Sequence, residues 1–187
     1  MIDNPVLQTM RNRFSCRSFD NSRKVEKEKI SAILDAAKHA PSGMNAQGWH
    51  FTILRTQRGH DLLLQAAGEN PPDGFTEKAP GADWPFQSDF CGAPVVILVS
   101  GCPDLPWPEV GAHLAAGNIM NGAVSLGLAT LWSTAFTKDL FRDVKSREVR
   151  RLLIPEGNEV YAALFLGYPK DVPNIRPPRR ENIETWL

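Results

Sequence analysis

The stretch from Glu109 to Leu126 constrains the fold of this chain more than any other part of the sequence. It reads as one long helix whose residues are small or apolar on nearly every side. Each glycine inside a helix costs about 1 kcal/mol of stability relative to alanine, and close approach by another helix usually offsets that cost. A helix that is apolar on most faces belongs in a core or at a subunit interface. The small residues are Gly111, Ala112, Ala115, Ala116, Gly117, Gly122 and Ala123.

Apolar periodicity around this helix predicts the remaining elements. Strand 94–99 is entirely apolar and therefore lies centrally in a sheet. We find no internal repeat and no domain boundary, so residues 1–187 form one α+β domain with a sheet of about four strands. The tail, 170–187, has no core pattern of its own. The predicted helices span 5–11, 27–39, 56–67, 109–126, 138–144 and 147–153, and the predicted strands span 49–54, 94–99, 128–132 and 160–166.

The segment 68–92 resists assignment to a helix or a strand. It contains two turn-forming clusters together with Phe75, Trp84, Phe86 and Phe90. A loop of this length inside a compact domain is usually functional or disordered. Its aromatic residues favour a lid or a pocket wall, and a variable surface loop anchored by the same aromatics is an equally good interpretation.

The bulk composition excludes several classes of protein. Formal net charge is zero, which disfavours a nucleic-acid binder that relies on a general basic field. The cysteines Cys16, Cys91 and Cys102 are odd in number and widely separated, which disfavours a disulfide framework or a zinc knuckle. The sequence shows no secretion signal and no apolar run long enough to span a membrane. We therefore expect a cytoplasmic protein with free thiols.

A loop of small and polar residues, 40–49, separates a predicted helix from a predicted strand. Pro41 ends the helix, and Ser42, Asn45 and Gln47 follow it. Hydroxyl and amide groups of this kind can read the polar edge of a ring. The loop is therefore a candidate ligand-binding segment.

Basic residues gather near both ends of the chain. In an extended segment, residues two apart point the same way, so Arg13, Ser15 and Arg17 would share one side. The planar guanidinium matches phosphate oxygens, so this arrangement could hold an anion. A solvated basic turn is the plainer interpretation. The pair Arg179 and Arg180 adds to the site only if the tail folds back toward the first cluster.

Several catalytic motifs are missing from the sequence. The four histidines are not at metal-ligand spacing, and there is no HExxH, no GxSxG, no phosphate-cradling GxxxxGK[ST] and no GxGxxG after a strand. The polar residues suit binding better than acid–base work. Such a protein is either a carrier or an enzyme whose cofactor performs the chemistry.

The order of these motifs resembles the FMN-dependent nitroreductase family. Members carry an R-x-S-x-R-x-F element, then a helix ending in A-P-S, then N-x-Q-P-W. Here residues 13–19 and 40–49 match these elements, with Gly48 where the family usually has proline. The resemblance continues through 118–136 and 166–169 to the basic tail, so it covers most of the chain.

The resemblance implies a set of FMN-binding residues. Arg13 and Ser15 match positions that hold the phosphate and ribityl chain, and Arg17 matches a cation near the pyrimidine edge. Thr134 matches a backbone N–H that faces N5, and the loop residues match those that contact the flavin of the other subunit. The implied set is Arg13, Phe14, Ser15, Arg17, Pro41, Ser42, Gly43, Asn45, Gln47, Trp132, Ser133, Thr134 and Ala135, with Arg179 or Arg180 completing the phosphate site.

The resemblance also implies a fold and a reaction. The nitroreductase-like fold has a central mixed or antiparallel sheet of about four to five strands flanked by helices. Its homodimer is intertwined, with FMN at the interface, and the tail 170–187 would wrap the partner. NADH or NADPH would deliver hydride to FMN N5, and a nitroaromatic, quinone or similar small oxidant would take it in a ping-pong reaction. Neither a metal nor a protein acid or base is required, and Phe75, Trp84 and Phe86 would shape the substrate pocket.

Three alternatives stay open at this point. A specialised flavin enzyme of the same family, such as a reductive dehalogenase, an azoline oxidase or a flavin-fragmenting enzyme, shares the same FMN frame. A flavin-binding protein without turnover would be yellow but would not be bleached by NADH or NADPH. A structural or interaction module would be colourless. The visible spectrum of the purified protein separates the last class from the others.

Overall fold

The structure analysed is a computed structural model of the chain. It describes most of the chain in six stretches, but not the side chains of 67–69 and 147. The described residues are 3–69, 90–134, 136–137, 147–173, 177–181 and 183–186.

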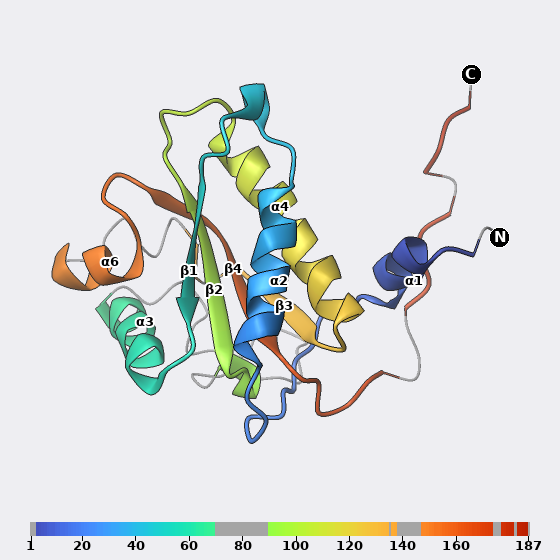
Figure 1. The fold of residues 1–187 in the computed structure, drawn as a ribbon, viewed down its shortest axis with the longest axis horizontal. Helices are drawn as coiled ribbons and strands as arrows, with labels where there is room; N and C mark the ends of the chain where they lie inside the picture. The colour runs from blue at the N-terminus through green and yellow to red at the C-terminus, as the bar shows by residue number, and fades with distance from the viewer. Residues whose placement is uncertain are drawn as a thin grey trace.

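The described part of the chain confirms the predicted order of helices and strands, with bounds that differ by at most two residues (Figure 1). Asn4 accepts hydrogen bonds at its side chain from the N–H groups of Val6 and Leu7, so it caps the first helix as its position before Pro5 predicts. The helices are α1 (Pro5–Asn12), α2 (Lys27–Lys38), α3 (Gln57–Glu69), α4 (Pro108–Ser125) and α6 (Arg147–Leu153), with short helices η1 (Gly43–Asn45) and η2 (Phe90–Gly92), and the strands are β1 (Trp49–Leu54), β2 (Val95–Gly101), β3 (Ala129–Ser133) and β4 (Glu159–Gly167).

The four strands form one antiparallel sheet in the order β1-β2-β4-β3. Every residue of β2 is buried, because a neighbouring strand lies on each side of it and helices cover the sheet. This confirms the central position predicted from its apolar sequence. A single parallel bridge joins Ser15 to Thr130 and extends the sheet locally beyond β3.

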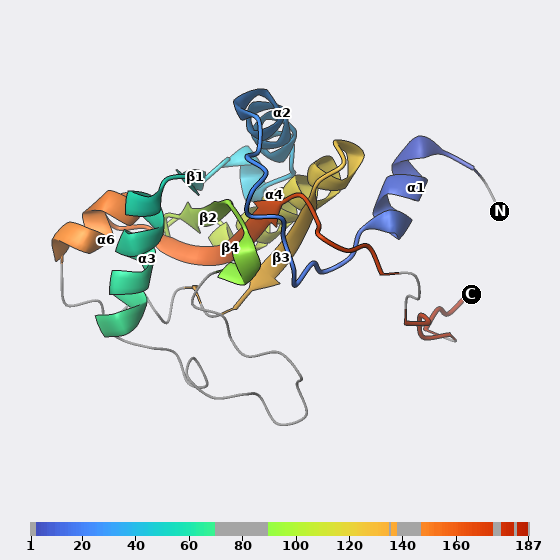
Figure 2. The same ribbon diagram turned by 90° about the horizontal axis from the view of Figure 1, so that it is seen from below.

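Two apolar clusters flank the sheet. One contains residues of α2 and α4, and the other contains residues of α3 and α6. Figure 2 shows α2 and α4 together on one side of the strands, and both ribbon views place α3 and α6 at the β1 edge. Helices therefore pack on the sheet as the α+β prediction requires.

The small residues of α4 allow α2 to approach it closely. A Cβ added at Gly122 would lie 3.6 Å from Ile33 Cγ1, and the Asn118 amide donates a 2.9 Å hydrogen bond to the Ala36 carbonyl. The side of α4 that faces away from the sheet exposes Val110 and Leu114, and a Cβ at Gly117 would meet nothing within 4 Å. Packing inside the domain thus accounts for part of the unusual composition of α4.

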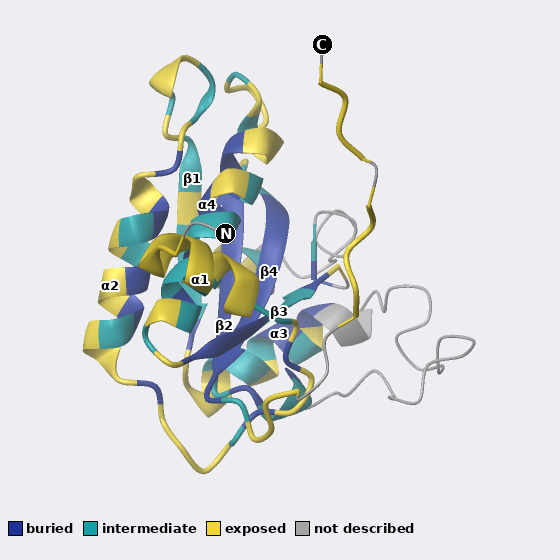
Figure 3. Cartoon of the chain, turned by 90° about the vertical axis from the view of Figure 1, so that its right-hand side faces the viewer, coloured by how far each residue is buried: buried dark blue, intermediate teal, exposed yellow. Residues whose placement is uncertain are grey.

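The two ends of the chain carry exposed apolar side chains. Helix α1 buries none of its residues, and the described part of the tail is exposed along most of its length (Figure 3). Met10 is half exposed, and Trp186 is 90% exposed. The predicted wrapping of a partner by the tail is not tested by a single chain.

Some predictions fall outside the described residues. The candidate pocket residues Phe75, Trp84 and Phe86 lie there, as does the predicted helix 138–144. The cysteines are free thiols, as expected. A search of the described helices found none with the length and apolarity needed to cross a bilayer.

Candidate functional site

The first arginine segment lies in an extended conformation beside β3. Helix α1 ends at Asn12, and Arg13 adopts extended dihedral angles. The Cys16 N–H then donates a 2.9 Å hydrogen bond to the Thr130 carbonyl. We call residues 13–20 the arm; β3 holds its middle, and residues 18–20 are bonded to Cys91, Tyr168 and Lys170.

The arm alternates between the core and a hollow, as its spacing predicts. Cys16 is buried and Phe14 packs against the same core cluster. Burial raises the pKa of the Cys16 thiol, so it stays protonated and serves as a packing group rather than a nucleophile. The hollow has a volume of about 320 Å³ and is lined by Arg13, Phe14, Ser15, Arg17, Pro173, Pro177 and Arg179.

The hollow joins the two basic clusters that are separate in the sequence. Arg179 reaches it from the tail, and Arg180 is not among its described lining residues. Three arginines line it, Arg13, Arg17 and Arg179. Guanidinium groups gathered in one hollow can bind an anion through charge-assisted hydrogen bonds.

The loop 40–49 is strained and held by its own side chains. Met44, Asn45 and Gln47 have φ values of 52°, 55° and 48°, the left-handed region that non-glycine residues avoid. The Gln47 N–H donates a 2.9 Å bond to Ser42 Oγ, and the Gln47 amide donates a 3.2 Å bond to Asn45 Oδ1. Strain of this kind gathers at ligand sites, where it fixes polar groups in advance.

Two glycines let the connection before α4 pack against this loop. A Cβ at Gly43 would lie 2.4 Å from Trp107 Cε3, and a Cβ at Gly48 would lie 2.5 Å from Leu105 Cδ1. At Gly48, where the resemblance leads one to expect proline, a side chain would displace the end of the Leu105 side chain.

The arm and the loop lie far apart in one chain. Trp49 pairs with Gly101 of β2, whereas Thr130 pairs with Leu166, which pairs with Val95 of β2. These two levels are six residues apart along β2, or roughly 20 Å, and the outer strands β1 and β3 are a further ~14 Å apart across the sheet. Figure 1 likewise shows η1 at one end of the sheet and the arm toward the other. One small ligand therefore cannot contact both segments of the same chain.

The predicted segment on β3 carries two unusual hydroxyls. Thr130 Oγ1 and Ser133 Oγ are buried and have no hydrogen-bond partner in the described part of the chain. Trp132, between them, packs edge-on against His113 with ring centroids 5.2 Å apart. Thr134 follows the strand in an exposed position, and Ala135 lies outside the described residues.

A larger hollow lies apart from the arm and the loop. It has a volume of about 860 Å³ and opens between the start of α3 and residues 90–95. None of the residues predicted to bind a cofactor is among its described lining residues. We therefore place the candidate site at the smaller hollow, where the predicted residues meet.

Sequence reasoning missed the residues that support both segments. Trp107 and Leu105 brace the loop. Tyr168 accepts a backbone hydrogen bond from Asp20 of the arm, and its hydroxyl contacts Glu26 and Lys29 at the start of α2. Tyr168 was singled out in the sequence only as part of the 166–169 motif that resembles the nitroreductase family. Its partners lie about 140 positions earlier, so no local pattern could have identified them.

Comparison with known proteins places the chain in a family. The model of the Nitroreductase family matches residues 10–168. A relative from Methanothermobacter thermautotrophicus, provisionally named an NADH dehydrogenase/NAD(P)H nitroreductase, is 30% identical over 97% of this chain and 87% of its own length. The iodotyrosine deiodinase of Thermotoga neapolitana is 28% identical over 86% of this chain and 89% of its own.

A solved structure shares the fold. The nitroreductase with bound FMN from Desulfitobacterium hafniense DCB-2 superposes with a TM-score of 0.78 at 25% identity, and all of each chain is covered. The arrangement of one sheet with helices on it is therefore a nitroreductase fold, as the motif order predicts. From the family match and the relatives together, this chain belongs to the nitroreductase family.

Proposed function

We propose that this protein is an FMN-dependent NAD(P)H oxidoreductase that reduces a nitroaromatic, a quinone or a similar small oxidant. The observation that carries the proposal is the hollow beside β3. There, Arg13 and Arg17 of the arm meet Arg179 of the tail, from opposite ends of the chain. A dianionic phosphate has the charge and the oxygen geometry that such a cluster recognises.

The described residues fit the cofactor in two further respects. The hollow adjoins β3 through the arm, and β3 carries the unpartnered hydroxyls of Thr130 and Ser133. A buried polar group without a partner costs roughly 1–3 kcal/mol. Because Thr130 and Ser133 lie three residues apart and face opposite sides of the sheet, a polar ligand on one side would relieve that cost for one of them. Bound FMN supplies the hydride chemistry between NAD(P)H and the oxidant.

The proposed roles combine the lining of the hollow with the family match. Arg13 and Arg179 bind the phosphate, and Ser15 donates its hydroxyl beside them. Arg17 places a cation near the pyrimidine edge of the ring, where it favours negative charge on the reduced cofactor. The backbone N–H of Thr134, just beyond β3, faces N5 of the flavin ring.

The second half of the site comes from another copy of the chain. Ser42, Asn45 and Gln47 are preorganised, but they lie too far from the arm to share a ligand with it. The outer face of α4, with Val110 and Leu114 exposed, is available to pair with a second subunit. In a two-fold symmetric dimer, each loop would face the arm of its partner.

Known relatives support this activity. The Methanothermobacter thermautotrophicus relative carries an NAD(P)H nitroreductase name, and the Desulfitobacterium hafniense structure binds FMN. The iodotyrosine deiodinase relative makes reductive dehalogenation the second candidate, so 3-iodotyrosine is the informative competing substrate.

The visible spectrum of the purified full-length protein tests the proposal first. We expect an absorbance band at about 450 nm that disappears on anaerobic addition of NADH or NADPH and returns when a nitroaromatic or a quinone is added. A colourless protein that FMN cannot reconstitute would overturn the proposal. Return of the band with 3-iodotyrosine and not with a nitroaromatic or quinone would favour the second candidate.

A further inference from the structure

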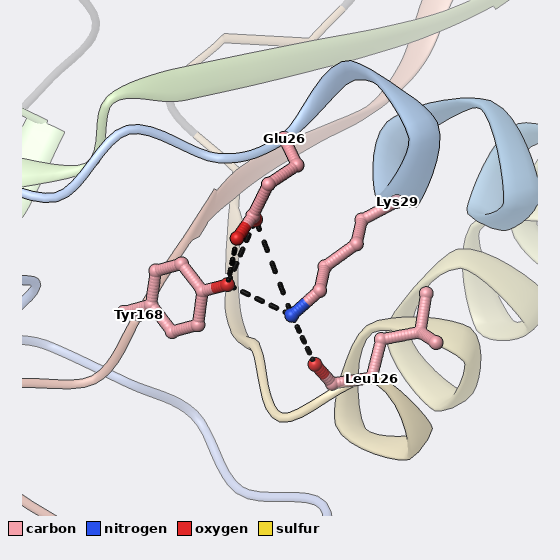
Figure 4. Close-up of polar contacts among 4 residues, drawn as sticks. All are labelled: Glu26, Lys29, Leu126 and Tyr168. Carbon is pink, nitrogen blue, oxygen red and sulfur yellow. Dashed lines mark hydrogen bonds and ion pairs between the residues drawn. The ribbon is translucent and has the colours of Figure 1, made fainter.

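A cluster of polar contacts surrounds the first residue after β4. Tyr168 is 5% exposed, and its hydroxyl donates to the Glu26 carboxylate, with oxygen–oxygen distances of 2.8 and 3.0 Å. The same hydroxyl accepts a 2.8 Å hydrogen bond from the Lys29 ammonium (Figure 4). A hydrogen bond to a charged partner is stronger than one between neutral groups, and this hydroxyl makes both of its bonds to charged groups.

Lys29 connects this cluster to the end of α4. Its ammonium also donates a 3.0 Å hydrogen bond to the carbonyl of Leu126, the residue that caps α4. A cation at the C-terminus of a helix is favourable because the last carbonyls carry partial negative charge. The Arg23 guanidinium lies 3.3 Å from the centroid of the Tyr168 ring. Helices α2 and α4 are thus tied to the exit of β4 at one point.

The backbone on either side of Tyr168 is joined to the arm. The Asp20 N–H donates a 2.9 Å hydrogen bond to the Tyr168 carbonyl, and the Lys170 N–H donates a 3.0 Å bond to the Ser18 carbonyl. A bridge between Phe19 and Pro169 lies between these two bonds. The arm and the start of the tail therefore run together at this point.

The arm and the tail both line the hollow, and both pass close to it from the point where they are bonded around Tyr168. Arg17 directly precedes the bonded Ser18, and Pro173 lies five positions beyond Tyr168. A shift of Tyr168 would therefore move the arm wall and the tail wall together. A shift of a fraction of an ångström is enough to weaken hydrogen bonds, whose strength falls steeply with misalignment.

We propose that Tyr168, Glu26 and Lys29 form a positioning cluster that sets the spacing of the arginines around the phosphate of FMN. This inference rests on the proposed function, because it takes the hollow to be the phosphate site. None of the three residues lines the hollow; they act through the arm and the tail. The cluster would tune the affinity for a phosphorylated flavin without contacting it.

The test compares FMN with riboflavin, which lacks the phosphate. Dissociation constants for both are measured by flavin fluorescence on the full-length chain, for wild type and for Tyr168→Phe. We expect wild type to prefer FMN, and Tyr168→Phe to lower that preference by roughly two- to tenfold, the range for one lost hydrogen bond. Riboflavin affinity should change little.

The chain offers a matched control. Tyr161 is the other tyrosine and is also buried. It lies within β4, near Gly101, far from the hollow. Tyr161→Phe should leave the preference for FMN as in wild type. If Tyr168→Phe does not fold, Lys29→Met removes the ammonium from a side chain that is 30% exposed, and it should lower the preference in the same way.

The outcomes separate the two proposals. Wild-type protein that binds riboflavin as tightly as FMN would show that the hollow is not a phosphate site, and both proposals would fail. Wild-type preference for FMN that survives intact in Tyr168→Phe and Lys29→Met would overturn the positioning cluster alone. Equal loss of affinity for both flavins would mean that the cluster only stabilises the fold, which also overturns the inference.

Discussion

The arm and the loop are both predicted to bind the same cofactor, yet different interactions fix their conformations. The arm is extended, is held by β3, and gains Arg179 from a tail about 160 positions away. The loop is made by neighbouring residues, with left-handed backbone at Met44, Asn45 and Gln47. Long-range pairing positions the first segment, and local strain positions the second.

This difference indicates which end of the cofactor each chain binds alone. The arm meets Arg179 of the tail inside one chain, so the proposed phosphate end of the site needs only that chain. The loop has its polar groups fixed in advance but lies far from the hollow of its own chain. We therefore expect phosphate binding to depend on a single subunit, and ring binding to depend on two.

The largest effect should come from mixing two inactive variants. Arg13→Ala disables the arm, and Gly43→Val disables the loop because its side chain would overlap Trp107. In a mixed dimer, one site receives both changes and the other receives neither. Co-expression of the two variants should restore roughly a quarter of wild-type activity, since half of randomly assembled dimers are mixed and each of these has one intact site.

The double variant is the control for this experiment. A chain carrying both Arg13→Ala and Gly43→Val is co-expressed with wild type. Each mixed dimer again contains the two substitutions, but both are now on one subunit. Its mixed dimers have one defect in each site and should be inactive, so only the wild-type homodimers, a quarter of random dimers, contribute and about a quarter of wild-type activity should remain. Activity near half of wild type in that sample, or none in the first, would contradict a site shared between subunits.

The next largest effect separates two neighbouring arginines in the tail. Arg179 lines the hollow and Arg180 does not, although sequence reasoning could not choose between them. Loss of a charge-assisted hydrogen bond from an exposed side chain is worth about 1.5 kcal/mol, so Arg179→Ala should weaken FMN binding about tenfold. Arg180→Ala should change it by less than about twofold. Equilibrium titration with FMN measures both, and the reverse order would reject the assignment.

The side on which each arm residue lies was predictable, because it depends on the alternation of neighbouring residues in an extended segment. Alternation predicted that Arg13, Ser15 and Arg17 share one side and Phe14 and Cys16 the other. The structure places the first three at the hollow and the other two against the core, and Phe14 also lines the hollow. The strand and helix patterns succeeded for the same reason. Burial repeats with the period of the element, and sequence carries that period directly.

The supports of both segments were not predictable in this way. The contact of Tyr168 with Glu26 and Lys29 joins positions about 140 residues apart, and that of Gly48 with Leu105 depends on how one loop lies on another. Neither contact produces a periodic pattern in the sequence. Composition identified the loop as a binding segment, but it could not reveal the left-handed backbone that fixes its side chains.

A smaller effect tests how the loop is braced. A Cβ at Gly48 would overlap the end of the Leu105 side chain, which is partly exposed and can move aside. Gly48→Ala should therefore lower the free energy of unfolding by only about 1 kcal/mol. Combining it with Leu105→Ala should recover most of that loss, and denaturant unfolding of the four proteins measures the coupling. Additive losses would mean that Leu105 is not what excludes a side chain at position 48.

The smallest expected effect is a difference in acid sensitivity between the two segments. Hydrogen bonds from the Ser22 hydroxyl and N–H lower the pKa of Asp20, and bonds from its own backbone N–H and from the Tyr168 hydroxyl lower the pKa of Glu26. A carboxyl with a lowered pKa stabilises the fold above its unfolded pKa, and that stability is lost as the pH falls through the folded value. Both groups lie beside the arm, whereas the polar side chains of the loop, Ser42, Asn45 and Gln47, do not titrate.

Acid should therefore loosen the arm before it loosens the loop. Hydrogen exchange of residues 13–25 should rise more than that of residues 42–49 between about pH 5 and about pH 3, after correction for intrinsic rates. Glu26→Gln, which cannot titrate, should narrow the difference between the two segments. If the loop opened first, the cluster around Tyr168 would not be what holds the arm. The contrast between a segment fixed at long range and one fixed by its own neighbours would then need another physical basis.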